Sequence, residues 1–159
     1  MNLPQQIATH FRTVYFGKNW TDVNLKDSLA GVDWELATTQ IYSCNTIAVL
    51  IFHMNYYVSN VLKVLHGQPL EASDKNAFDC PPVMNQEDWE KLQKQVFADA
   101  EAFATEIEKL PENKFGEIFH SEKYGNYYRN IHGIVEHNHY HLGQIVLLKK
   151  IIGQLEQNC

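Results

Sequence analysis

Apolar residues recur every three to four positions in four long stretches of the chain, and no stretch alternates apolar with polar residues as a half-buried strand would. The stretches span residues 4–16, 46–65, 86–110 and 126–153. Stretch 46–65 is apolar on almost every side, which is typical of a helix in the middle of a packed domain. The pattern predicts an all-α protein built as a four-helix bundle.

Capping residues set the expected ends of these helices. Pro4 stands in the first turn of the first helix, and Asn85 is placed to cap the third. Ser43 or Asn45 is the candidate N-cap of the second helix, and Gly67 is its stop.

The connections are unequal. Within residues 18–40, residues 25–29 are expected to form one or two helical turns that end at Gly31, and residues 33–37 to form another. We expect this connection to pack against the bundle. Residues 114–124 are expected to contain a short ordered turn. Residues 68–85 form a loop of about eighteen residues, a length that is uncommon in compact domains and often functional, and we expect it to cover one end of the bundle.

Composition narrows the class of protein. With 159 residues, 45% hydrophobic and 20% charged, residues 1–159 are expected to form a single soluble domain. A net charge of −6 without a Lys/Arg cluster argues against a nucleic-acid partner. No secretory signal is visible, and stretch 46–65 is too often interrupted by polar residues to predict a membrane span. Cys44, Cys80 and Cys159 contain no CxxC pair, which favours reduced thiols in the cytoplasm.

Histidine is over-represented, and five of the eight copies lie between His120 and His141. His137 and His141 are four residues apart on one predicted helix, so they project about 40° apart, one turn above the other. Two imidazoles placed in this way can occupy adjacent corners of one metal ion. His139 points about 160° away from His141 and cannot join them.

A third ligand has to come from elsewhere in the chain, either from another histidine or from an acidic residue. The remaining histidines are His10, His53, His66, His120 and His132. Among these, His53 interrupts an apolar helix at mid-length, where an unpaired imidazole would cost roughly 1–3 kcal/mol. A lone histidine in a core helix is more often hydrogen-bonded than metal-bound, so the residues alone leave both interpretations open. A metal site of His53, His137 and His141 is the resulting hypothesis.

Two motifs carry a family resemblance. The run His137-Asn138-His139-Tyr140-His141-Leu142-Gly143-Gln144, together with Leu50-Ile51-Phe52-His53-Met54-Asn55 on the second helix, resembles the DinB/YfiT-like superfamily of small four-helix bundles. Asn19-Trp20-Thr21 with Leu25 and Leu29, and residues 74–79, are similar to one branch of that superfamily. The resemblance covers nearly the whole chain.

The resemblance implies a divalent metal, nickel or zinc with manganese or iron as further options, held by three histidine nitrogens with water at the open positions. It also implies a homodimer and thiol-dependent transfer or isomerisation with low-molecular-weight thiols. Three neutral ligands leave the ion its full charge, which lowers the pKa of a bound thiol or water. We therefore expect a thiol-dependent S-transferase or a hydrolase-like activity on a small-molecule substrate. The competing interpretation is a metal-stabilised bundle that catalyses nothing and binds a small molecule or a protein partner in a stress response.

No general base is obvious from the sequence. Glu136 points about 100° away from its neighbour on the helix and is interpreted as a surface charge or as a partner of a ligand. Tyr56, Tyr57 and Tyr140 are candidates to line a pocket.

Two residues that follow the histidine pair have expected roles near the site. Gly143 is expected to allow close helix approach, and Gln144 to donate or accept a hydrogen bond near the pocket. Cys44 and Cys80 lack an activating neighbour, which argues against a nucleophilic role.

Overall fold

The computed structural model describes residues 1–157, so Cys159 lies outside the described residues. Over this range the chain is all-helical and contains no strand, which confirms the all-α prediction. The α-helices are α1 (Leu3–Phe16), α2 (Leu25–Leu29), α3 (Trp34–Thr38), α4 (Ile47–Leu65), α5 (Gln86–Lys109) and α6 (Tyr127–Gln157). The 3₁₀-helices η1 (Asp74–Asn76), η2 (Glu112–Gly116) and η3 (Glu122–Tyr124) lie in the connections.

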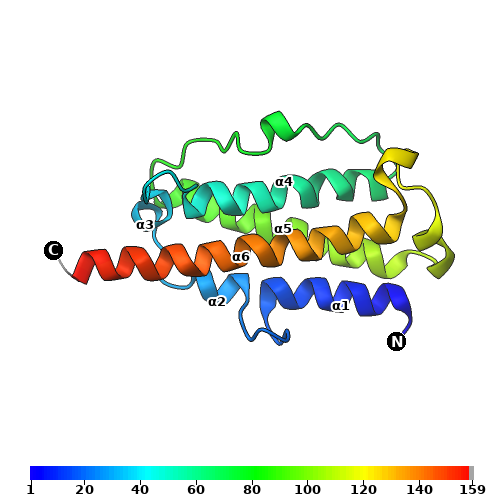
Figure 1. Ribbon diagram of the computed structural model, residues 1–159, viewed down its shortest axis with the longest axis horizontal. Coiled ribbons are helices and arrows are strands. Elements are labelled where there is room, and N and C mark those ends of the chain that lie inside the picture. The colour runs from blue at the N-terminus through cyan, green and yellow to red at the C-terminus, as the bar shows by residue number, and fades with distance from the viewer. Residues whose placement is uncertain (158–159) are drawn as a thin grey trace.

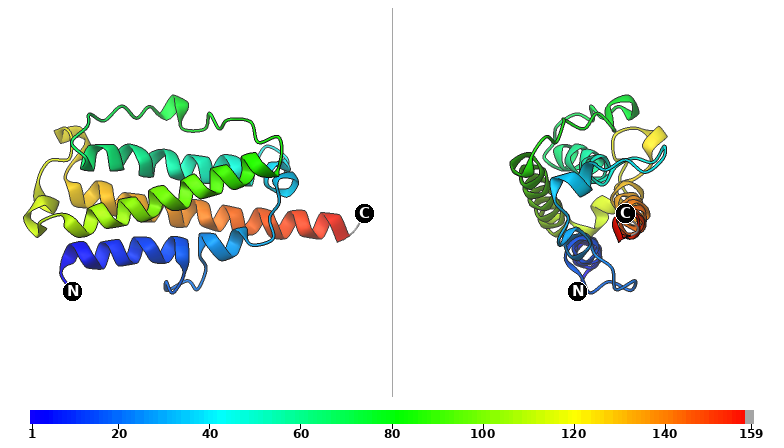
Figure 2. Two further views of the ribbon diagram at one scale, coloured as in Figure 1. Left: turned by 180° about the vertical axis from the view of Figure 1, so that it is seen from behind. Right: turned by 90° about the vertical axis from the view of Figure 1, so that its left-hand side faces the viewer.

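The four long helices α1, α4, α5 and α6 lie side by side along the long axis of the molecule (Figure 1). Helix α5 contacts α1 and α4, and α6 contacts α4 and α1. Seen along the axis, the helices surround a common interior (Figure 2). Apolar residues from all four helices form one buried cluster there, because each helix turns its apolar face inward.

The loop prediction was wrong in its placement. Helices α4 and α5 run in the same direction, so the chain has to return over the whole length of α4 before α5 can start (Figures 1 and 2). Helix α4 has 19 residues and is therefore about 28 Å long. A segment that returns along this length needs many residues, which explains the length of segment 68–85. The segment therefore runs along the outside of α4 and does not cover an end of the bundle. We call residues 68–85 the crossover.

Helix ends follow the predicted caps with one exception. The Asn85 side chain accepts a hydrogen bond from the backbone N–H of Asp88 and caps α5. The N-cap of α4 is Thr46, whose hydroxyl accepts from the N–H of Val49, and the candidates Ser43 and Asn45 were wrong. A cap has to precede the first helical residue directly, and helix α4 begins later than the sequence pattern suggested.

Two features of the core needed the structure to explain them: the very apolar helix α4 and the polar residue Asn138 in the apolar stripe of α6. Helix α4 has the length and hydropathy of a membrane span, but 61% of its most apolar window is buried inside the protein, as for a core helix. Asn138 is fully buried in the apolar stripe of α6, and its side-chain amide donates to the Tyr15 hydroxyl of α1 at 3.0 Å. This hydrogen bond joins the first and last helices one residue away from His137.

Candidate metal centre

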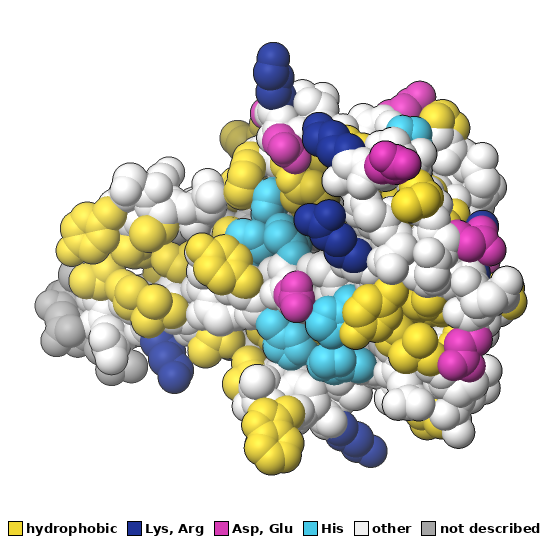
Figure 3. Space-filling model, turned by 45° about the vertical axis from the view of Figure 1, so that its right-hand side comes forward, with side chains coloured by type: hydrophobic (Ala, Val, Ile, Leu, Met, Phe, Trp, Pro, Cys, Tyr) yellow, Lys and Arg dark blue, Asp and Glu magenta, His cyan; other side chains and the backbone are white. Residues whose placement is uncertain are grey.

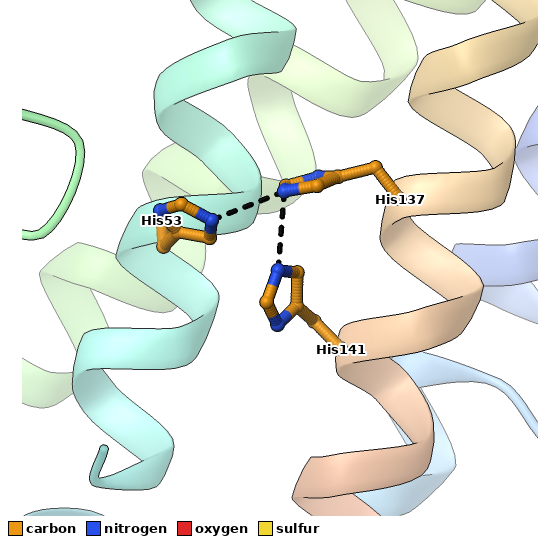
Figure 4. A group of neighbouring side chains, drawn as sticks. All are labelled: His53, His137 and His141. Atoms are coloured by element: carbon orange, nitrogen blue, oxygen red, sulfur yellow. Dashed lines mark hydrogen bonds between the residues drawn. The ribbon is translucent and has the colours of Figure 1, made fainter. Parts of the chain in front are cut away.

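Helices α4 and α6 bring three imidazoles together in the interior between them (Figure 4). The Nε2 atom of His137 lies 3.1 Å from Nε2 of His53 and 3.1 Å from Nε2 of His141. His53 and His141 are buried, with 5% and 6% of their surface exposed, and His137 is half-buried. One ligand atom from each residue lies within 4.8 Å of the other two, so the three residues could hold one metal ion. We call them the triad.

Hydrogen bonds at the far side of two rings fix which nitrogen carries the proton. The Nδ1 atom of His53 lies 2.9 Å from the carbonyl oxygen of Ala77 in the crossover, and a carbonyl only accepts. The Nδ1 atom of His141 lies 2.7 Å from Oε1 of Gln144, one turn further along α6. Both Nδ1 atoms therefore donate, and both Nε2 atoms present a lone pair to the middle of the triad. Such outer partners commonly orient imidazoles that bind metals.

His137 lacks an outer partner of this kind. Its Nδ1 atom is buried and forms no hydrogen bond of normal geometry among the described residues, although the adjacent Asn138 side chain raises the pKa of the ring against the effect of burial. Without an ion, its Nε2–H can donate to only one of the two facing lone pairs, and the other lone pair stays unsatisfied. A cation at the centre would accept all three lone pairs at once. Metal–nitrogen bonds of about 2.1 Å in a tetrahedral site place nitrogens about 3.4 Å apart, so the 3.1 Å separations fit a metal after a small expansion.

The electrostatics keep the triad neutral at physiological pH. Burial lowers the pKa of His53 and of His141 below the ordinary value. The pKa of His137 falls to about 4, first because of burial and then because His141 and His53 stand beside it. A neutral imidazole is the form that binds a metal, so protons do not compete for the three nitrogens near pH 7.

The crossover supplies contacts that the sequence did not reveal. The ring of Phe78 stacks on the His53 ring, with centroids 3.7 Å apart and planes inclined by 9°. The Tyr56 hydroxyl donates to the carbonyl of Ser73, and the Tyr57 hydroxyl donates to Oδ1 of Asp74 at 2.9 Å. Two sequence signals pointed to this segment: the unusual length of the crossover and the family resemblance of residues 74–79.

The three tyrosine candidates have different positions. Tyr57 packs its ring against those of His53 and His137, with centroids 5.2 Å and 4.9 Å away. Tyr56 fastens the crossover to α4, whereas Tyr140 lies against the His141 ring and is 65% exposed. Tyr57 is thus the tyrosine that lines both the triad and the cavity described below.

Of the other residues expected to act near the triad, Gln144 does so, and Glu136 and Gly143 do not. Gln144 forms the expected hydrogen bond. Glu136 pairs with His132 at 3.3 Å on the surface, so it is a surface charge. The role expected for Gly143 was wrong, because a Cβ atom added there would meet no heavy atom within 4 Å and no helix approaches closely.

Neither described cysteine joins the triad. Cys44 is exposed, and Cys80 lies in a separate cavity with Phe52 and Val83. Burial raises the pKa of the Cys80 thiol to about 11, which keeps it protonated and unreactive near neutral pH.

Histidine side chains gather in two places on the face shown in Figure 3. Outside the triad, His139 turns away as expected: its Nδ1 atom donates to the Val135 carbonyl, and its ring lies 5.8 Å from that of His10 on α1. His132 is near enough to His10 to help lower the pKa of that imidazole, after burial and His139. We call His10, His132 and His139 the outer histidines.

A cavity of about 440 Å³ adjoins the triad. His137 and Tyr57 form part of its wall, and Asp74 lies on the same wall beside Tyr57. A larger cavity of about 790 Å³ lies between α2 and the C-terminal part of α6 and includes no triad residue. We call the 440 Å³ cavity the triad cavity, since it is the one that gives a small molecule access to His137.

Comparison with known proteins gave no match among family models, curated proteins or solved structures.

Proposed function

We propose that this chain is a metal-dependent enzyme of the DinB/YfiT-like type, in which His53, His137 and His141 hold a divalent ion, nickel or zinc, inside a four-helix bundle. The observation that carries the proposal is the orientation of His53 and His141. Hydrogen bonds at their Nδ1 atoms leave both Nε2 lone pairs directed at Nε2 of His137. When bound, the ion supplies a Lewis acid that lowers the pKa of a thiol or water toward neutrality. The proposed reaction is transfer of a low-molecular-weight thiol to an electrophile, or hydrolysis.

Asp74 is the proposed proton acceptor. It is the carboxylate among the described residues that line the triad cavity, and it already accepts a hydrogen bond from Tyr57. Burial and this hydrogen bond raise the pKa of Tyr57 to about 12, so Tyr57 stays protonated and acts as a donor. In thiol transfer the S–H proton passes to Asp74, sulfur bonds to the electrophilic carbon, and the leaving group departs with its bonding pair.

The test combines metal analysis with turnover. The purified chain is expected to contain about one metal ion, and the loaded protein to consume an activated aryl halide or ester in the presence of a thiol or water. Asp74→Asn is expected to lower kcat by about 100-fold or more without changing metal content, because general-base contributions are of that size. Asp79→Asn, a substitution in the same crossover, is the matched control.

Metal without turnover under any thiol or ester would favour the second candidate, a metal-stabilised bundle that binds a small molecule or a protein partner. The first candidate is preferred because the triad opens to a cavity that also contains a carboxylate.

We also propose that the chain forms a homodimer through α6. Tyr140, Leu147 and Leu155 are 65%, 59% and 52% exposed, and their spacing of seven and eight residues places them on one face of the helix. A second copy of the same face would cover this stripe. Light scattering is expected to give twice the mass of one chain, and Leu147→Asp to return the mass to that of a monomer. A wild-type monomer at micromolar concentration would refute this proposal.

A further inference from the structure

The triad cavity has an apolar body and a charged rim. Val61 of α4, Phe119 and Ile134 are buried residues that contribute apolar wall. Lys123 and Arg129 lie on the rim, on the side where α6 begins. His137 lies further along α6, so the cavity extends from two cations at one end to the triad at the other.

Neither cation has an anionic partner among the side chains that the structure describes, those of residues 1–155. The Lys123 ammonium lies 5.4 Å from the centroid of the Tyr124 ring and forms no ion pair with a described side chain. The Arg129 side chain passes over Gly125, where an added Cβ would lie 3.1 Å from Arg129 Cδ. Its guanidinium forms no hydrogen bond within the described part of the chain. Asp74, the carboxylate in the cavity wall, is already bonded to Tyr57. Two unpaired cations at one cavity are notable in a chain of net charge −6.

Gly133 keeps the route between the cations and the triad open. It lies one turn after Arg129 and one turn before His137 on α6, and it lines the cavity. A Cβ atom added at Gly133 would meet nothing within 4 Å, so packing does not require glycine there. Glycine in a helix interior costs about 0.5–1 kcal/mol relative to alanine. Its presence is explained if the space above it has to hold a ligand.

We infer that the triad cavity binds a small organic anion whose carboxylate is held by Arg129 and Lys123 while its other end reaches the metal position at His137. This inference rests on the proposed function for the role of that other end. The Cα atoms of Arg129 and His137 are about 12 Å apart along the helix, so the ligand needs a chain of several atoms between its two ends. The apolar wall fits a hydrocarbon chain, and guanidinium geometry fits a carboxylate.

The test compares mercaptohexanoate with mercaptohexanol, two probes that differ only in the terminal charge. In the metal-free protein, amide NMR shifts around Gly133 and Arg129 report binding. In the cobalt-loaded protein, the thiolate-to-cobalt absorption band reports that the sulfur has reached the ion. The acid is expected to bind about tenfold more tightly than the alcohol in both forms, as one charge-assisted contact would provide.

Substitutions locate the contact. Arg129→Gln is expected to remove the tenfold preference for the acid and to leave the affinity for the alcohol unchanged. Lys63→Gln removes an equal charge from an exposed position outside the cavity wall and is the matched control. Gly133→Leu is expected to weaken binding of both probes without changing metal content, whereas Gly153→Leu, on the same helix but outside this cavity, is expected to change neither.

The two proposals fail in different ways. Equal affinity of the acid and the alcohol in the metal-free protein would overturn the anion site, even if metal binding and thiol turnover are found. A preference for the acid that depends on Arg129, in a protein that binds no metal, would overturn the proposed function and leave the anion site standing.

Discussion

His137→Ala is expected to weaken the binding of zinc or nickel by more than about 100-fold, because even the loss of an outer partner of a ligand costs about 10–100-fold. The Nε2 atom of His137 lies between those of His53 and His141, 3.1 Å from each. Its removal leaves the ion with two protein ligands in place of three. His53→Ala and His141→Ala are expected to show losses of similar size. Competition against a chromophoric chelator measures each affinity.

The matched control is His139→Ala, which removes an imidazole from the same stretch of α6 without touching the triad. Among the described residues the triad is the one histidine cluster placed to hold an ion, so His139→Ala is expected to leave both the affinity and the metal content unchanged. Unchanged tight binding in any one of the three triad variants would remove that residue from the ligand set.

Gln144 offers a graded version of the same experiment. Gln144→Ala removes the acceptor that fixes the His141 proton on Nδ1 and is expected to cost about 10–100-fold in metal affinity. Gln144→Glu keeps an acceptor at the same place and is expected to keep most of the affinity. Equal losses in both variants would indicate a packing effect of the side chain.

Removal of the metal is expected to produce the largest change in stability. With free metal at about 1,000 times its dissociation constant, binding to the folded state alone contributes about 4 kcal/mol to the free energy of unfolding. Urea unfolding with and without a chelator at pH 7 measures this difference. The His137→Ala variant is expected to show no such difference.

Acid is expected to lower the free energy of unfolding of the metal-free protein through the three imidazoles of the triad. His137 has a folded-state pKa of about 4 against an ordinary value of 6.5, so between these two values the unfolded chain binds a proton that the folded chain does not. Its contribution to stability is therefore fully present above pH 6.5 and is lost as the pH falls toward 4. The lowered pKa values of His53 and His141 act in the same direction.

The acid dependence can be measured from urea midpoints between pH 4 and 7. In His137→Ala the slope is expected to be smaller, because one of the three groups that bind a proton on unfolding is gone. A slope equal to that of the wild-type chain would mean that the lowered pKa of His137 does not contribute to folding.

Local periodicity was enough to find the helices and two of the three triad residues. The apolar repeat located α1, α4, α5 and α6 to within a few residues, and the four-residue spacing placed His137 and His141 on one face. Spacing also predicted that His139 would turn away. These features depend on contacts within a single helix, whose geometry is fixed by the backbone alone.

The direction of α5 depended on tertiary structure. Two helices joined by a loop of eighteen residues can run antiparallel or parallel, and the sequence pattern is the same in both cases. Because α5 runs parallel to α4, the crossover lies along α4 and brings Ala77 and Phe78 to His53 and Asp74 to Tyr57. Gly143 was misjudged for a related reason, since a glycine in the sequence does not show whether a neighbouring helix is close.

The sequence by itself therefore determined the helices, the histidine pair on α6 and the apolar setting of His53. Only the tertiary structure decided that His53 meets His137 across 84 residues, that the crossover fixes the His53 proton, and that Lys123 and Arg129 border a cavity beside the triad. The physical reason is range: a helical pattern carries information over one or two turns, whereas a site between helices depends on how separate faces pack together.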